Sequence, residues 1–130
     1  LCSLTLSEEN KIDIANHPIL SDIVQLSLKS DSCTARHAAS ALANLAENHS
    51  VHKQLIEALI PAVASQLVKA TIPDVGMVMD ATRCLCNLSS NPTSIQSVLE
   101  ADGVSALIRG SRVDDVVTWF LRYCRKSRIT

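Results

Sequence analysis

Aromatic residues are almost missing from this sequence: one Trp, one Phe and one Tyr make up 2% of its 130 residues. Glycine and proline are also scarce, with three and four copies. β-Sandwiches and barrels need turn residues every ~8–12 positions and usually place aromatic residues in their strands, so both classes are disfavoured. The apolar residues, 47% of the chain, must then form an aliphatic core, which favours an all-α fold.

Long apolar runs are missing as well. No segment approaches the ~18 apolar residues of a membrane helix, and the N-terminus lacks the basic and apolar regions of a signal peptide. We therefore expect a soluble protein without membrane insertion, located in the cytoplasm, with the nucleus as the alternative. A net charge of −1 with this apolar content excludes a disordered chain. The five scattered cysteines predict buried thiols rather than a disulfide framework.

Charge is distributed unevenly along the chain. Residues 1–108 hold six basic and eleven acidic side chains, whereas residues 109–130 hold six basic and two acidic ones. This basic end could attract an anionic partner, or it could be a solvated helix terminus. Nucleic-acid binding is disfavoured because exposed aromatic residues are not interleaved with the basic ones.

A short pattern recurs along the chain. Ala-Leu-Ala-Asn-Leu-Ala at residues 41–46 matches Cys-Leu-Cys-Asn-Leu-Ser at residues 84–89, at an offset of 43, and residues 1–5 overlay residues 42–46. Each complete copy ends an amphipathic helical pattern with small residues on its apolar stripe. The two stripes are Ala35, Ala38, Ala39, Leu42 and Leu45, and then Val78, Ala81, Cys84, Leu85 and Leu88. Small side chains let neighbouring helices approach closely, as stacked repeats require.

Two further helices are expected in each unit. Short helices with polar beginnings are predicted near residues 10–15, 51–56 and 95–99, and more apolar ones at residues 19–29, 62–70 and 104–109. We divide a single domain, residues 1–130, into the end of one repeat (1–9), two whole repeats (10–47 and 48–90) and a terminal capping repeat (91–130). Because the sequence begins inside a predicted helix, we expect the C-terminal fragment of a longer solenoid.

The repeats resemble the armadillo family. The resemblance rests on the Leu-x-Asn-Leu endings at residues 42–45 and 85–88, on Glu-Glu-Asn-Lys at residues 8–11, and on residues 100–108, which include Gly103. It implies a right-handed α-solenoid of about three three-helix repeats, the first and last incomplete or atypical. It also implies that the third helices line a concave groove for extended partner peptides, with Asn44 and Asn87 facing that groove.

The residues of the two long helices predict the same face. Arg83 and Asn87 are four positions apart and project together, and the preceding repeat has a matching column. That column is Arg36, Ser40 and Asn44. Asparagine amides can both donate to and accept from a peptide main chain, but they can equally bond the backbone of a neighbouring repeat.

The remaining site candidates lie near the C-terminus. Trp119 and Tyr123 share the four-residue spacing and either join the groove or seal the end of the core. Arg36 and Arg83 would repel a basic segment, so the groove should favour acidic or neutral peptides.

Catalytic and metal-binding patterns are not found. The three glycines are isolated, so there is no phosphate loop, and no nucleophile or zinc motif occurs. Cys84 and Cys86 would diverge around a helix, and we expect His37, His49 and His52 to face solvent. We therefore predict no enzyme activity, no cofactor, no metal and no small-molecule substrate.

Together these patterns predict a non-enzymatic scaffold that binds an extended segment of another protein along its concave groove. The alternative is an armadillo-type regulator of a chaperone or GTPase that embraces a folded domain, and a structural spacer comes third. Replacing Asn44 and Asn87 by Ala should weaken binding and leave the thermal midpoint unchanged. The apolar N-terminal edge could also mediate self-association.

Overall fold

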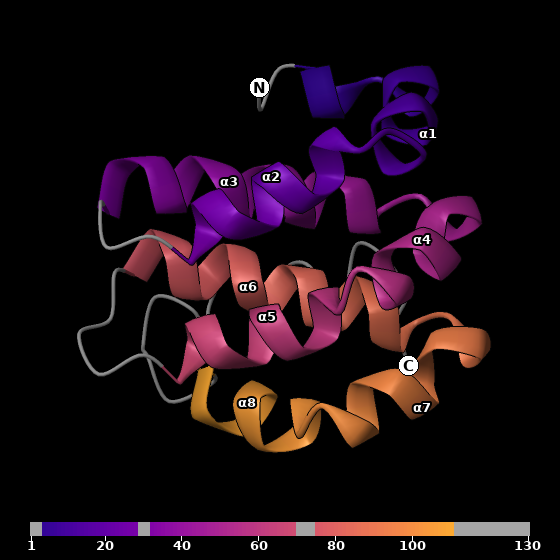
Figure 1. The fold of residues 1–130 in the computed structure, drawn as a ribbon. Coiled ribbons are helices and arrows are strands. Elements are labelled where there is room, and N and C mark those ends of the chain that lie inside the picture. The colour runs from indigo at the N-terminus through magenta and orange to yellow at the C-terminus, as the bar shows by residue number, and fades with distance from the viewer. Residues whose placement is uncertain (1–3, 29–31, 70–74, 111–130) are drawn as a thin grey trace.

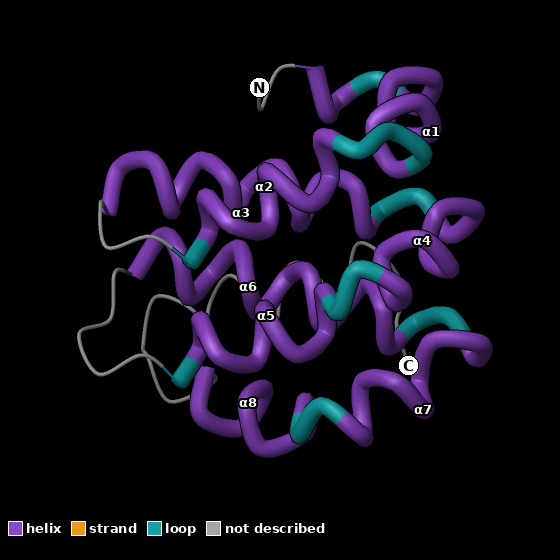
Figure 2. Tube along the Cα trace, in the orientation of Figure 1, coloured by secondary structure: helices purple, strands orange, loops and turns teal. Residues whose placement is uncertain are grey.

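Helices account for all the regular secondary structure in the part of the chain that the computed structural model describes, residues 4–28, 32–69 and 75–110 (Figure 2). The prediction of an all-α fold is thus confirmed for these residues. The α-helices, joined by short loops, are α1 (Glu8–Ala15), α2 (Ile19–Ser27), α3 (Ser32–Ala46), α4 (His52–Glu57), α5 (Ile60–Val68), α6 (Val75–Ser89), α7 (Pro92–Glu100) and α8 (Gly103–Gly110). Two 3₁₀ turns, η1 (Leu4–Leu6) and η2 (His49–Val51), precede α1 and α4.

The helices are stacked in tiers (Figure 1). α1, α2 and α3 form the first tier, α4, α5 and α6 the second, and α7 and α8 the described part of the third. α3 packs against α6 between the first and second tiers, and α8 packs against both α5 and α6 between the second and third. α3 and α6 are both 15 residues long and begin 43 residues apart, which is the offset of the sequence pattern.

The core between the tiers is aliphatic. Every residue of the two predicted stripes is buried, from Ala35 at 1% exposed to Leu88 at 0%. Alanines in the second half of α3 are also buried, and they allow α6 to pack closely against it. The large aliphatic side chains of the core come from the other helices as well, including Ile23, Leu55 and Ile60.

A polar residue caps the beginning of each tier. The side-chain oxygens of Ser7, Asn48 and Asn91 each accept a hydrogen bond from a backbone N–H two or three residues later, and these bonds help to start the short helices. The cap at Ser7 starts α1 at Glu8, so the first short helix begins before residue 10, where the sequence-based boundary had been drawn.

The turns that lead into α5 and α8 share an unusual backbone conformation. Leu59 has a φ of 61° and Asp102 a φ of 60°, both in the left-handed region. Gly103, the next residue after Asp102, has no positive φ. Its lack of a side chain is needed for space instead, because a Cβ there would lie 2.8 Å from the carbonyl oxygen of Val98.

Candidate binding face

The side chains of the predicted groove meet where α3 and α6 lie side by side. The Arg83 guanidinium on α6 donates from Nη2 to Asn44 Oδ1 at 2.9 Å and to the carbonyl oxygen of Ser40 at 3.5 Å, both on α3. The Arg36 side chain is at least one helix turn away and lies over Gly76. A Cβ atom added to Gly76 would be 2.6 Å from Arg36 Nε. The tertiary structure therefore brings the two predicted columns together on one face, which we call the α3–α6 face.

The two asparagines, however, are buried within this face. Asn44 is 6% exposed and Asn87 is 5% exposed. Asn44 Nδ2 donates to the hydroxyl of Thr5 at 3.0 Å, and Asn87 Nδ2 donates to the carbonyl oxygen of Ala43 at 3.4 Å. Asn87 thus bonds the backbone of the preceding tier, as in the alternative that the sequence had left open, whereas Asn44 bonds a side chain of η1. The role of both amides in binding a peptide stays a prediction.

A network of charges runs from the first tier to the second beside these amides. Arg83 pairs with Glu47 through Nη1 and Oε1 at 2.6 Å and with Asp80 at 3.4 Å. The other Glu47 oxygen lies 3.4 Å from the ammonium group of Lys11, which also pairs with Glu8 at 2.7 Å. Lys11 is only 2% exposed, so its charge needs these carboxylates.

Sequence reasoning did not assign Lys11 or Glu47 to this face, whereas it had placed Met79 or Asp80 one turn before Arg83 on the same helix. Part of the signal was present, because Glu8 and Lys11, and likewise Asp80 and Arg83, are three positions apart with opposite charges. The Glu47 contacts connect residues 36 positions away in both directions, and only the stacking of the tiers brings them together.

The network changes the electrostatics expected of the face. The Arg83 side chain is 15% exposed and is paired with two carboxylates, so it offers a partner little free positive charge. Arg36, in contrast, is exposed. The predicted preference for acidic or neutral segments now depends mainly on Arg36.

One of the three histidines was placed wrongly by the sequence. His37 and His49 are exposed, but His52 is 1% exposed. Its Nε2 lies 2.6 Å from the carbonyl oxygen of Ala46, which can only accept, so Nε2 carries the proton. Nδ1 then accepts from the Asn91 amide at 3.0 Å and the Ser94 hydroxyl at 3.2 Å. Burial, followed by the charge of nearby His49, lowers the pKa of His52, although its bond to Ala46 acts in the opposite direction.

The cysteines do not form a metal site in the part of the chain that is described. Cys84 and Cys86 are buried as predicted, whereas Cys33 is exposed. Burial raises the pKa of Cys84 to about 12, which makes its thiol inert at neutral pH. No group of three or more potential metal ligands occurs in residues 4–28, 32–69 and 75–110.

Two of the predicted site residues lie outside the described residues. These are Trp119 and Tyr123, which belong to residues 111–130.

Within the described residues, no helix is long and apolar enough to cross a membrane.

Comparisons with known proteins add no relative. No protein-family model, no curated protein and no solved structure matches the chain.

Proposed function

We propose that this chain is a non-enzymatic protein-binding module, a right-handed armadillo-type solenoid that acts as an intracellular scaffold through its α3–α6 face. The observation that carries the proposal is the contact of Arg83 with Asn44 and Ser40. It aligns the polar columns of two tiers into one continuous strip, which is the arrangement that an extended partner segment requires.

A partner segment would meet the exposed residues of this strip first. Arg36 is exposed and Ser40 is half-buried, and Glu47 keeps about a third of its side chain in contact with solvent. An acidic or polar segment can pair with Arg36, whereas Arg83, Glu47 and Asp80 together carry a formal charge of −1, so the acidic part of the segment should lie at Arg36. A basic segment would be repelled at Arg36.

The burial of Asn44 and Asn87 favours a second candidate. Clamping a peptide main chain needs amides that are accessible, whereas embracing a folded domain needs only shape and charge. Both amides already bond across the tiers, Asn44 with Arg83 and Asn87 with Ala43. This observation supports the regulator that binds a folded domain, such as a chaperone or GTPase, on the same face.

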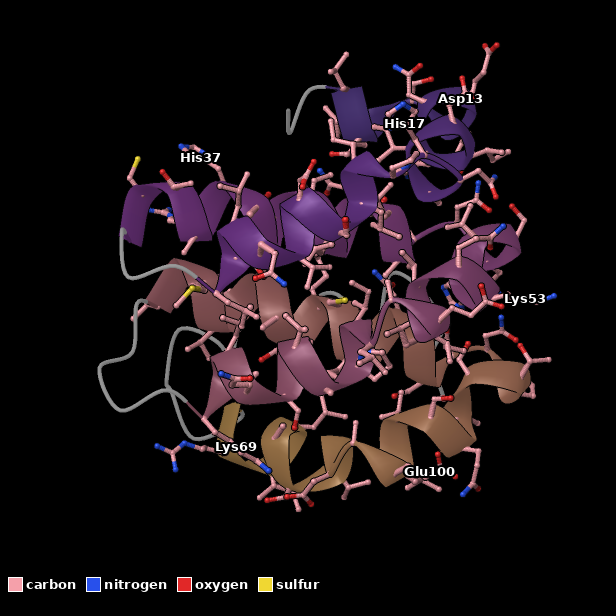
Figure 3. The ribbon with its side chains drawn as sticks, viewed as in Figure 1. Asp13, His17, His37, Lys53, Lys69 and Glu100 are labelled. Atoms are coloured by element: carbon pink, nitrogen blue, oxygen red, sulfur yellow. The ribbon has the colours of Figure 1, made fainter. Side chains whose placement is uncertain are left out.

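The test is a matched pair of charge reversals. Arg36→Glu changes the α3–α6 face, and Lys53→Glu makes the same change of charge on α4, where Lys53 is exposed and points away from the stack (Figure 3). Peptides selected from a random displayed library against the unmodified protein should be acidic or neutral. We expect Arg36→Glu to weaken their binding at least about tenfold and Lys53→Glu to leave it unchanged.

The outcomes separate the two candidates. The folded-domain mode is supported if proteins captured from a cell extract bind the unmodified protein but not the Arg36→Glu variant, and if no selected peptide displaces them. If neither peptides nor proteins distinguish Arg36→Glu from Lys53→Glu, the α3–α6 face is not the binding surface.

The asparagine substitutions are no longer a clean test of binding. Asn87→Ala removes the donor to the carbonyl oxygen of Ala43, and Asn44→Ala removes a partner of both Thr5 and Arg83. Each loss should cost about 1–2 kcal/mol of unfolding free energy. The double variant should therefore lower the thermal midpoint, contrary to the expectation from sequence.

A further inference from the structure

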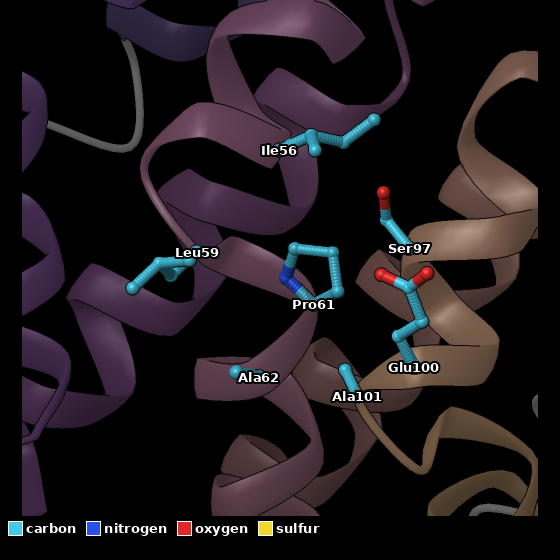
Figure 4. A pocket seen from close by; sticks show the side chains of 7 residues that line it. All are labelled: Ile56, Leu59, Pro61, Ala62, Ser97, Glu100 and Ala101. Carbon is cyan, nitrogen blue, oxygen red and sulfur yellow. The ribbon is translucent and has the colours of Figure 1, made fainter.

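A small groove opens between α4, the first turn of α5 and the end of α7, and none of the residues that line it belongs to α3 or α6 (Figure 4). It has a volume of about 240 Å³. Pockets for small molecules usually have about 300–1,000 Å³, so this groove suits a single side chain rather than a whole ligand. We call it the outer groove.

One wall of the outer groove is apolar and includes a strained residue. Ile56, Leu59 and Pro61 form this wall, and Leu59 is 67% exposed. Leu59 also has a left-handed backbone, with a φ of 61°, which is uncommon for a bulky residue and costs about 1–3 kcal/mol.

The equivalent turn of the next tier has Asp102 in the same backbone conformation. Aspartate tolerates this region better than leucine does, and Asp102 also pairs with Lys69. Leu59 therefore adds little to the core and is unfavourable for the local backbone. Together with Ile56 and Pro61, Leu59 forms an apolar wall that the apolar stem of a partner side chain can cover.

The opposite wall is polar and anionic. Figure 4 shows the Ser97 hydroxyl and the Glu100 carboxylate on the α7 side of the groove, across from Ile56 and Pro61. Within the described residues, Glu100 accepts a hydrogen bond from the neutral amide of Gln96 at 3.1 Å and forms no ion pair. The groove thus combines an apolar wall with a carboxylate that pairs with no cation among the described residues.

We propose that the outer groove binds an arginine side chain of a partner protein, independently of the α3–α6 face. The three methylene groups of the arginine would lie against Ile56, Leu59 and Pro61. Its guanidinium would donate two parallel hydrogen bonds to the Glu100 carboxylate. A single arginine inserted in this way is a frequent anchor of protein–protein interfaces.

The probe for this proposal is n-butylguanidinium, which has the apolar stem and the charge of arginine and nothing else. Titrated into the ¹⁵N-labelled protein, it should shift backbone amide signals within residues 56–62 and 97–101 and not those of α3. The neutral analogue n-butylurea should bind at least about tenfold more weakly, because a charge-assisted hydrogen bond is lost.

Two variants and one control identify the walls. Glu100→Gln should weaken binding of n-butylguanidinium about tenfold, whereas Glu9→Gln makes the same change of charge at an exposed residue of α1 and should have no effect. Leu59→Gly should weaken binding and at the same time raise the thermal midpoint, because glycine adopts the left-handed region without strain. A purely structural role of Leu59 would leave binding unchanged.

Three results would overturn the proposal. The first is a probe that shifts no signal in the outer groove, and the second is equal binding by Glu100→Gln and the unmodified protein. The third is a change in the signals of these residues on dilution without probe, since that would mean that a second copy of the chain occupies the groove.

Discussion

Protonation of His52 should weaken the junction between the second and third tiers. The ring is fully buried, and it joins the end of α3, through the carbonyl oxygen of Ala46, to Asn91 and Ser94 at the beginning of α7. Only the neutral ring satisfies all of these contacts. A second proton on Nδ1 would face the Asn91 amide, which is itself a donor because its oxygen accepts from the backbone of Thr93.

The magnitude follows from linkage between protonation and folding. Histidine in the unfolded chain has a pKa of about 6.5, and the pKa of His52 in the folded protein is lower. Above about pH 6.5 the ring is neutral in both the folded and the unfolded state, so the full stability is present. As the pH falls below about 6.5, only the unfolded chain binds the proton. The free energy of unfolding then decreases by up to about 1.4 kcal/mol per pH unit, until the folded pKa is reached.

Urea unfolding at pH 7.5, 6.5 and 5.5 measures this effect. His52→Gln should lower the free energy of unfolding by about 1–3 kcal/mol at pH 7.5, because buried hydrogen bonds are lost, and it should flatten the dependence between pH 6.5 and 5.5. His37→Gln removes an exposed histidine of α3 and should keep the steeper dependence. Identical pH dependence in the unmodified protein and in His52→Gln would refute this account of the junction.

Two further predictions concern packing and thiol chemistry. Gly103→Ala should destabilise the fold by about 1–3 kcal/mol, because its Cβ would meet the backbone of Val98. Gly76→Ala should be neutral or stabilising by up to about 1 kcal/mol, because only the end of the flexible Arg36 side chain must move. Urea midpoints compare the two variants, and equal effects would contradict the clash. Brief labelling with N-ethylmaleimide at pH 8, followed by peptide mass mapping, should modify Cys33 and spare Cys84, whose pKa of about 12 leaves roughly one thiol in 10⁴ ionised. Labelling of Cys84 in the folded protein at a rate close to that of Cys33 would show that the core around it opens readily.

Part of the candidate site could be predicted from the sequence because its residues follow local rules. Arg36, Ser40 and Asn44 are four positions apart on one helix, and Arg83 and Asn87 share that spacing on the next. A helical period therefore assigns them to matching columns before any fold is known. The exposure of their side chains was not predictable in this way, since it depends on the distance between α3 and α6.

The burial of Lys11 and His52 was also not predictable from the sequence. Lys11 and His52 each lie four residues after a capping residue, Ser7 and Asn48, and both are fully buried. A lysine and a histidine near the beginning of a short polar helix would ordinarily be assigned to solvent. Their burial is tolerated because acceptors from distant parts of the chain, such as Glu47 for Lys11, satisfy them.

The sequence by itself determined the class of fold, the three-helix unit and the aliphatic core. The scarcity of aromatic residues and glycine, and the recurrence of small residues at helical spacing, are local properties of the chain. The tertiary structure alone decided that Asn44 and Asn87 bond between tiers, that Arg83 is neutralised by Glu47, and that Pro61 and Glu100 lie on opposite sides of the outer groove (Figure 4). Such pairings join residues more than 30 positions apart, and their distances are set by how closely one tier packs on the next.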